Sequence, residues 1–182
     1  MTEKELEEYL PKENEDVIKT KKAMYESLKH QSRVYESLKS VISPHFLTYE
    51  DRGLLEDRFI FIVVKLVGKN LIDVLADCPD KKFSMVTALR VGEQTLAAIR
   101  DLHSCGYIHR NIKPDNFAIG REEDGNLHTV FLLDFKFARK FMTEGKDLRL
   151  QRQQAPFRGA PRYASITALS MVNDDLFIYM IL

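Results

Sequence analysis

A long helix followed by polar loops is the feature of this sequence that most constrains its fold. Residues 84–103 (SMVTALRVGEQTLAAIRDLH) begin with Ser84, which can cap the first helical turn. Apolar residues recur in this stretch at helical spacing, at Leu89, Leu96, Ile99 and Leu102. Gly106 follows as a helix stop, and short apolar segments separated by polar residues come after it. This order predicts an α+β fold that carries its chemistry on the loops after the long helix.

The N-terminal part of the sequence predicts one helix and one strand. Residues 20–42 contain neither glycine nor proline and carry a mostly helical apolar stripe, which Pro44 ends. Residues 59–67 (FIFIVVKLV) are rich in β-branched and aromatic residues and predict a buried strand. Residues 1–16 are strongly charged and predict a solvated leader.

Composition argues against several classes of protein. The 182 residues include 27 basic and 27 acidic side chains, a balance that disfavours a nucleic-acid binder driven by bulk charge. Cys78 and Cys105 alone cannot form a disulfide scaffold or a zinc site, and they indicate reduced thiols in an intracellular protein. The apolar runs, including the last seven residues 176–182, are too short to span a bilayer and are interpreted as core elements. We therefore expect a cytoplasmic protein without a membrane segment, with the nucleus as the alternative compartment.

Three motifs after the long helix resemble the catalytic segment of protein kinases. They are HRNIKPDN at residues 109–116, LLDFKFAR around Asp134, and FRGAPRYAS at residues 157–165. Their details are similar to the casein kinase 1 superfamily, especially its tau-tubulin-kinase-like and worm-expanded branches. LVGKNLIDVL at residues 66–75 is similar to that family's hinge and following helix. The resemblance implies a protein-kinase-like bilobal α+β fold, with a partial N-lobe at 17–67 and a partial C-lobe at 68–182 behind the leader at 1–16.

The resemblance implies ATP and magnesium as cofactors and assigns residues to them. Asp134 matches the aspartate that holds magnesium against the phosphates, and Asn116 matches the ligand of a second magnesium ion. Lys113 would contact the transferring phosphate as a point charge. His109 and Arg110 would support the loop structurally.

The nucleotide itself is expected to meet residues of the N-terminal half. Val17–Lys19 resembles the end of the strand that carries the phosphate-pairing lysine, which makes Lys19 the candidate. Val64 matches the gatekeeper position, and backbone groups near Lys65 and Val67 would meet adenine.

Three substitutions depart from the family pattern. The family has Asp where this chain has Asn111, and a carboxamide is not a useful base near neutral pH. Lys136 replaces the glycine of the DFG motif, where a side chain restricts the backbone and an ammonium group competes electrostatically with magnesium. Gln31 falls where the family has the glutamate of its C helix, so it cannot form the Lys–Glu ion pair of an active kinase.

Two further departures concern whole elements. Gly53 is the first glycine of the sequence, so no glycine-rich loop precedes it and the N-lobe is expected to be truncated. The sequence ends within what resembles helix F, so the C-lobe is expected to be incomplete after that helix.

These observations favour a casein kinase 1-like Ser/Thr protein kinase family member that is catalytically impaired, a pseudokinase acting as a protein-interaction module. The alternatives are an active kinase in which Asn111 orients the substrate hydroxyl, and a non-functional partial gene product. Arg158 and Arg162 are expected either to bind a phosphorylated residue of a protein substrate or to form structural salt bridges. The expected partner is a protein, not a nucleic acid or a membrane, and the oligomeric state stays open.

Overall fold

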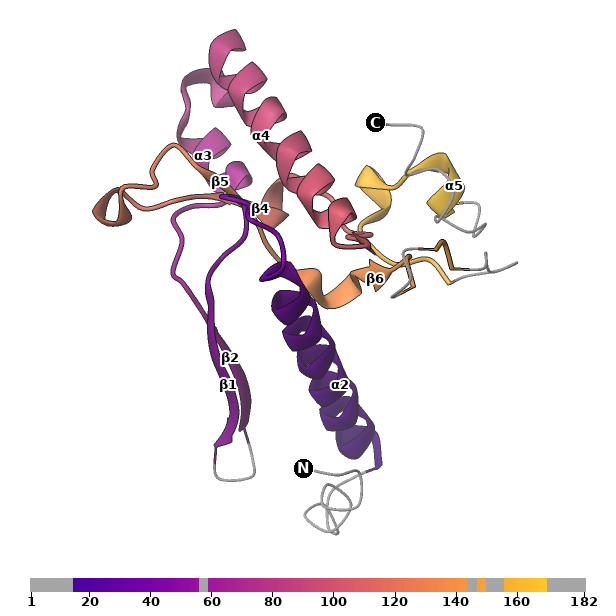
Figure 1. The fold of residues 1–182 in the computed structure, drawn as a ribbon. Helices are drawn as coiled ribbons and strands as arrows, with labels where there is room; N and C mark the ends of the chain where they lie inside the picture. Colours follow the sequence, from indigo (N-terminus) through magenta and orange to yellow (C-terminus); the bar gives the residue numbers. More distant parts are fainter. Residues whose placement is uncertain (1–14, 56–58, 144–146, 150–155, 170–182) are drawn as a thin grey trace.

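The computed structural model describes residues 15–55, 59–143, 147–149 and 156–169, which form the predicted α+β fold (Figure 1). Its elements in chain order are α2 (Glu15–Leu38), β1 (Tyr49–Leu55), β2 (Phe59–Val64), α3 (Leu71–Asp77), α4 (Met85–Ser104), β3 (Tyr107–Ile108), β4 (Phe117–Ile119), β5 (Val130–Leu132), β6 (Arg139–Lys140) and α5 (Ile166–Leu169). Most of the predicted leader and all of the apolar residues 176–182 lie outside the described residues.

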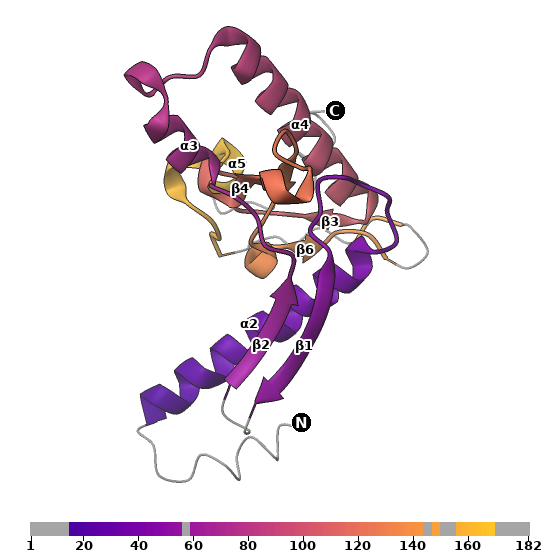
Figure 2. The ribbon, with the colours of Figure 1, turned by 90° about the vertical axis from the view of Figure 1, so that its left-hand side faces the viewer.

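The first part of the chain is the long helix α2 beside the β1–β2 hairpin (Figures 1 and 2). The strands pair antiparallel, with Gly53 opposite Phe61. Ile62 and Val64 pack against the core, whereas Phe61 and Val63 are 38% and 41% exposed. The strand was predicted to be buried, and this is wrong for one of its faces, because alternate residues of β2 point away from the core.

Helix α2 corrects the prediction for the residues before position 20. A strand was predicted to end at Lys19, but residues 15–38 form one uninterrupted helix, and Lys19 lies exposed on it. The segment contains no glycine or proline, and its many Lys and Glu residues are good helix formers. Intrinsic propensity therefore favours extending the helix over forming a strand here.

Helix α4 begins and ends where the sequence predicts. The Thr87 N–H donates to the Ser84 hydroxyl oxygen at 3.1 Å, and Gly106 follows the helix with a φ of 77°. The predicted apolar stripe is buried only in part, because Leu102 is fully buried while Leu89 is exposed.

The remaining strands form two short antiparallel sheets that bring distant segments together. β4 pairs with β5, and β3 pairs with β6. The second pairing places the loop at residues 109–116 beside the turn at residues 134–138. None of the helices in the described ranges combines the length and apolar character needed to cross a bilayer.

An aromatic column, made of Tyr49, Tyr35, Phe135 and His109, connects the two parts of the chain. Tyr35 stacks on Tyr49 with ring centroids 5.5 Å apart and meets Phe135 edge-on at 5.1 Å. The rings of His109 and Phe135 are also 5.5 Å apart. All four residues are buried and Phe135 is completely so, which makes this column the centre of the core.

Candidate active site

The loop at residues 109–116 is fixed through its first residue. The Nε2–H of His109 donates to the Leu133 carbonyl oxygen at 2.8 Å, and the Asn111 N–H donates to His109 Nδ1 at 3.3 Å. These two bonds require the tautomer with its proton on Nε2. Burial lowers the pKa of His109, which favours the neutral ring that these bonds need. The prediction that His109 is packed and hydrogen-bonded is confirmed.

Two asparagines form the middle and the end of this loop. Asn111 and Asn116 are only 6% and 5% exposed. The Asn116 Nδ2–H donates to the Asn111 main-chain oxygen at 2.7 Å, so the amide oxygen of Asn116 is turned away from that bond. This oxygen is a hard donor of the kind that magnesium accepts. The side chain of Asn111 is a neutral amide and offers no carboxylate to accept a proton.

Asp134 lies across from the loop, in a strained backbone conformation. Its φ is 62° and its ψ is 68°, a left-handed conformation that Asp tolerates better than most residues. It directly precedes a 3-10 helix, Phe135–Phe137. The neighbouring Tyr35 is affected by this carboxylate, because burial and the charge of Asp134 together raise the pKa of Tyr35 to about 12.

Lys136 binds the carboxylate of Asp134. Its Nζ lies 2.9 Å from Asp134 Oδ2 and 5.3 Å from the centre of the Phe137 ring. Lys136 lies inside the 3-10 helix and is not among the residues with a positive φ, so it causes no backbone strain. The side chain of Lys136 was expected to restrict the backbone, and this is not seen. Its ammonium group was expected to compete with magnesium, and it does lie on the carboxylate of Asp134.

This ion pair decides whether the residues fit a magnesium ion. Two unit charges 4 Å apart interact by about 4 kcal/mol at an effective dielectric constant of 20, and a divalent ion doubles the repulsion from Lys136. Among the described residues no group of three or more His, Cys, Asp or Glu side chains gathers to offset that repulsion. While Lys136 pairs with Asp134, its ammonium group competes with a magnesium ion for this carboxylate, and the Asn116 amide oxygen is the other donor of the implied site.

Lys113 and Arg110 are both engaged with the protein itself. Lys113 Nζ lies 3.7 Å from Asp115 Oδ2, a distance typical of a loose ion pair. Arg110 has a φ of 64°, and its Nε–H donates to the Phe137 carbonyl oxygen at 2.7 Å. Arg110 therefore ties the loop to the turn after Asp134, in line with its predicted supporting role.

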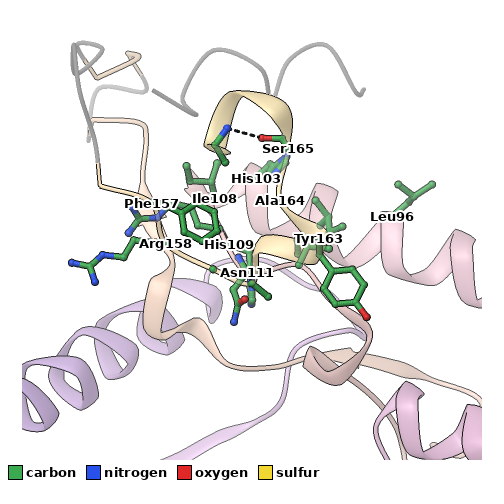
Figure 3. Close-up of a pocket in the computed structure, with 16 residues that line it drawn as sticks. Leu96, His103, Ile108, His109, Asn111, Phe157, Arg158, Tyr163, Ala164 and Ser165 are labelled. Carbon is green, nitrogen blue, oxygen red and sulfur yellow. Dashed lines mark hydrogen bonds between the residues drawn. The ribbon is translucent and has the colours of Figure 1, made fainter. Parts of the chain in front are cut away.

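A cavity of about 330 Å³ lies between α4, this loop and residues 157–168 (Figure 3). Gly159 allows the close approach, because its φ is 120° and an added Cβ would lie 2.4 Å from the Arg110 carbonyl oxygen. Arg158 lines the cavity, and Figure 3 shows its side chain extending away from Tyr163. Arg162 is not among the lining residues and lies 5.8 Å from the Tyr163 ring.

The structure does not bring Lys19 and Gln31 together. They lie on the same helix twelve positions apart, which corresponds to about 18 Å along its axis. Besides Tyr35, the residue that joins α2 to the site is His30, whose ring Nε2 donates to the Ala138 carbonyl oxygen at 2.7 Å. Sequence reasoning missed His30, although its position beside Gln31 on the predicted helix was the available signal.

The three residues expected near adenine lie at and after the end of β2. Val64 packs against the core and Val67 is half-buried in the connection to α3. The Lys65 N–H already donates to the Thr48 carbonyl oxygen at 3.0 Å, so this N–H is not available to a ligand. Its ammonium group lies 3.3 Å from Asp124 Oδ1.

Comparison with known proteins agrees with this architecture. The model of the protein kinase domain family matches residues 9–170. A Dictyostelium discoideum protein named a probable serine/threonine-protein kinase is 37% identical over 116 residues, 64% of this chain and 23% of that protein. The Caenorhabditis elegans serine/threonine-protein kinase spe-6 is 39% identical over 124 residues, 66% of this chain and 32% of its own length. A candidate casein kinase I from the same worm is 38% identical over 125 residues, 66% of this chain and 36% of its own length.

This chain thus spans 36% or less of the length of each of these relatives.

Proposed function

Because the chain belongs to the protein kinase family, with relatives of the casein kinase 1 type, we propose that it is a catalytically impaired Ser/Thr kinase domain that serves as a protein-interaction module. The observation that carries this proposal is the 2.9 Å ion pair between Lys136 and Asp134. Phosphate transfer depends on positioning and on neutralising the phosphate charge, and metal ions supply much of that neutralisation. Lys136 occupies the carboxylate on which such an ion depends.

Asn111 supports the same proposal from the opposite side of the site. A substrate hydroxyl must lose its proton as the phosphate is transferred, and Asn111 provides no group that accepts it. The loss of a general base typically lowers a rate by about 10² to 10⁴. The amide lines the cavity of Figure 3 and offers a substrate hydroxyl a hydrogen-bond partner but no base.

The proposal is tested by transfer of radiolabelled phosphate from ATP to casein. We expect the parent chain to stay near background and Asn111→Asp alone to gain little, because Lys136 still blocks the metal. The double variant Asn111→Asp/Lys136→Gly should gain the most. Turnover by the parent near the ordinary kinase range of about 1 to 100 per second would overturn the proposal.

An active kinase is the second candidate, and the Asn116–Asn111 hydrogen bond favours it. This bond orders the loop and leaves the Asn116 amide oxygen as a possible ligand, while Lys113 stands two residues after Asn111. In this alternative Asn111 orients the hydroxyl and ATP with magnesium is used as in the family generally. If this alternative holds, the parent chain transfers phosphate and the Asn111→Ala variant does not.

A further inference from the structure

Helix α2 and the β1–β2 hairpin lie side by side (Figure 2), and a groove outside the site described above lies between them. Its volume is about 580 Å³. We call it the hairpin groove. Its lining includes Tyr25, Lys29, Arg33, Arg52, Gly53 and Phe61.

The hairpin groove is positively charged. Lys29, Arg33 and Arg52 line it, and its lining includes no Asp or Glu within the described part of the chain. None of these three cations forms a salt bridge with a carboxylate of residues 15–55, 59–143, 147–149 or 156–169. Arg52 is held in place, because its Nη1–H donates to the buried Ser32 hydroxyl oxygen at 2.6 Å. The groove thus gathers three cations and no described carboxylate in its lining, on a chain whose net charge is zero.

The hairpin groove also has an exposed aromatic wall. Phe61 is 38% exposed and lies across Gly53, its partner on the neighbouring strand. A Cβ added at Gly53 would lie 2.7 Å from the Phe61 ring, so the ring can occupy this position only because residue 53 has no side chain. Tyr25 lies on the helix side, 5.5 Å from Lys29 Nζ. Apolar contact surface and positive charge therefore occur together in one recess.

We propose that the hairpin groove binds an acidic segment of a partner protein, with an aromatic or aliphatic side chain of that segment packed against Phe61. This inference rests on the proposed function, since it gives the interaction module a class of partner. Carboxylates of the segment would pair with Lys29, Arg33 and Arg52, none of which forms a salt bridge with a carboxylate of the described residues. A nucleic acid fits less well, because backbone tracking needs an extended basic stripe and the cations here are confined to one recess.

The binding test uses the full chain and a fluorescein-labelled peptide in which Glu alternates with Phe and Leu. We expect saturable binding by fluorescence anisotropy, and weaker binding as salt is added. Arg33→Glu reverses an exposed charge and should weaken binding roughly fivefold to tenfold. Phe61→Ser removes the aromatic wall and should weaken binding by a similar factor. Arg90→Glu is the matched control, because Arg90 is exposed on α4 and does not line the groove, and its affinity should equal that of the parent.

Three outcomes would overturn the inference. They are failure of the parent to bind the peptide at low salt, equal affinity in Arg33→Glu and the parent, and binding of poly(U) RNA in place of the peptide. The phosphate-transfer assay on the same proteins separates this result from the proposed function. If the parent transfers phosphate, only the impaired-kinase proposal is contradicted. If the parent neither transfers phosphate nor binds the peptide, only the groove proposal is contradicted.

Discussion

The loop at residues 109–116 and the turn at residues 134–137 lie against each other but are held by different groups. Contacts of the loop end on main-chain atoms, since His109 bonds to the Leu133 carbonyl and Asn116 to the Asn111 carbonyl. The turn depends in addition on its own side chains, the buried ring of Phe135 and the ion pair of Lys136 with Asp134. A change of side chain at position 111 therefore leaves the loop geometry intact, whereas a change at position 136 alters the charge of the site directly.

The largest effect should come from removing the ring that anchors the turn. Phe135→Ala deletes a completely buried side chain that contacts Tyr35, Phe46 and His109. We expect the free energy of unfolding to fall by about 3 to 5 kcal/mol, measured by urea denaturation. Phe61→Ala is the comparison, because its ring is partly exposed and should cost clearly less. Equal losses would mean that Phe135 does not anchor the turn.

The next effect tests the loop. Asn116→Ala removes the Nδ2–H that satisfies the buried Asn111 carbonyl, and an unsatisfied buried acceptor costs about 1 to 3 kcal/mol. Urea denaturation should register this loss. Asn111→Ala is the control, because its main-chain carbonyl still accepts the bond and no side-chain hydrogen bond of Asn111 is seen within the described residues. If Asn111→Ala costs as much as Asn116→Ala, the loop is not held mainly through its main chain.

A third experiment tests the charge of the turn. Lys136→Met keeps the length of the side chain but frees the Asp134 carboxylate. We expect the affinity for Mn²⁺, measured from the free-ion signal in electron paramagnetic resonance, to rise at least about tenfold, equivalent to about 1.4 kcal/mol. Lys82→Met, at an exposed position after α3, should leave the affinity unchanged. Equal affinity in Lys136→Met and the parent would refute the blocking role of Lys136.

The comparison also explains what the sequence could predict. The limits of α4 follow from local signals, a capping Ser84 and a terminating Gly106, and these were predicted correctly. The order of the motifs predicted that residues 109–116 and Asp134 belong to one site, and the β3–β6 pairing places them together. Local signals of this kind need no knowledge of distant residues.

Other features depend on contacts between segments far apart in the chain and could not be predicted in this way. The pairing of Tyr35 with Tyr49 and Phe135 joins three segments with no common motif. The exposure of Phe61 depends on which face of β2 packs on the core. The strand expected at Lys19 was predicted from the family resemblance. The same residues have high helix propensity, and they form part of helix α2.

The smallest expected effect concerns the link between loop and turn, the buried His109. Burial lowers its pKa, so the unfolded chain binds a proton at a higher pH than the folded chain. The stability that His109 contributes is complete above its unfolded pKa of about 6.5 and is lost as the pH falls from there towards the lower folded pKa. The slope is at most about 1.4 kcal/mol per pH unit for this single group. His103 is half-buried, desolvation lowers its pKa as well, and it adds a slope of the same sign.

Urea denaturation between about pH 7 and pH 5 can separate the two histidines. His109→Gln removes one titrating ring, so the decline in stability on acidification should be shallower than in the parent, whatever the variant loses at neutral pH. His103→Gln should flatten the curve by its own share, and the double variant should flatten it most. A His109→Gln curve parallel to that of the parent would mean that protonation of Nδ1 does not disturb the bond that this nitrogen accepts from the Asn111 N–H. In that case the loop and the turn would be joined mainly through Arg110 and Phe135, and the loop would keep its geometry even with a charged imidazole.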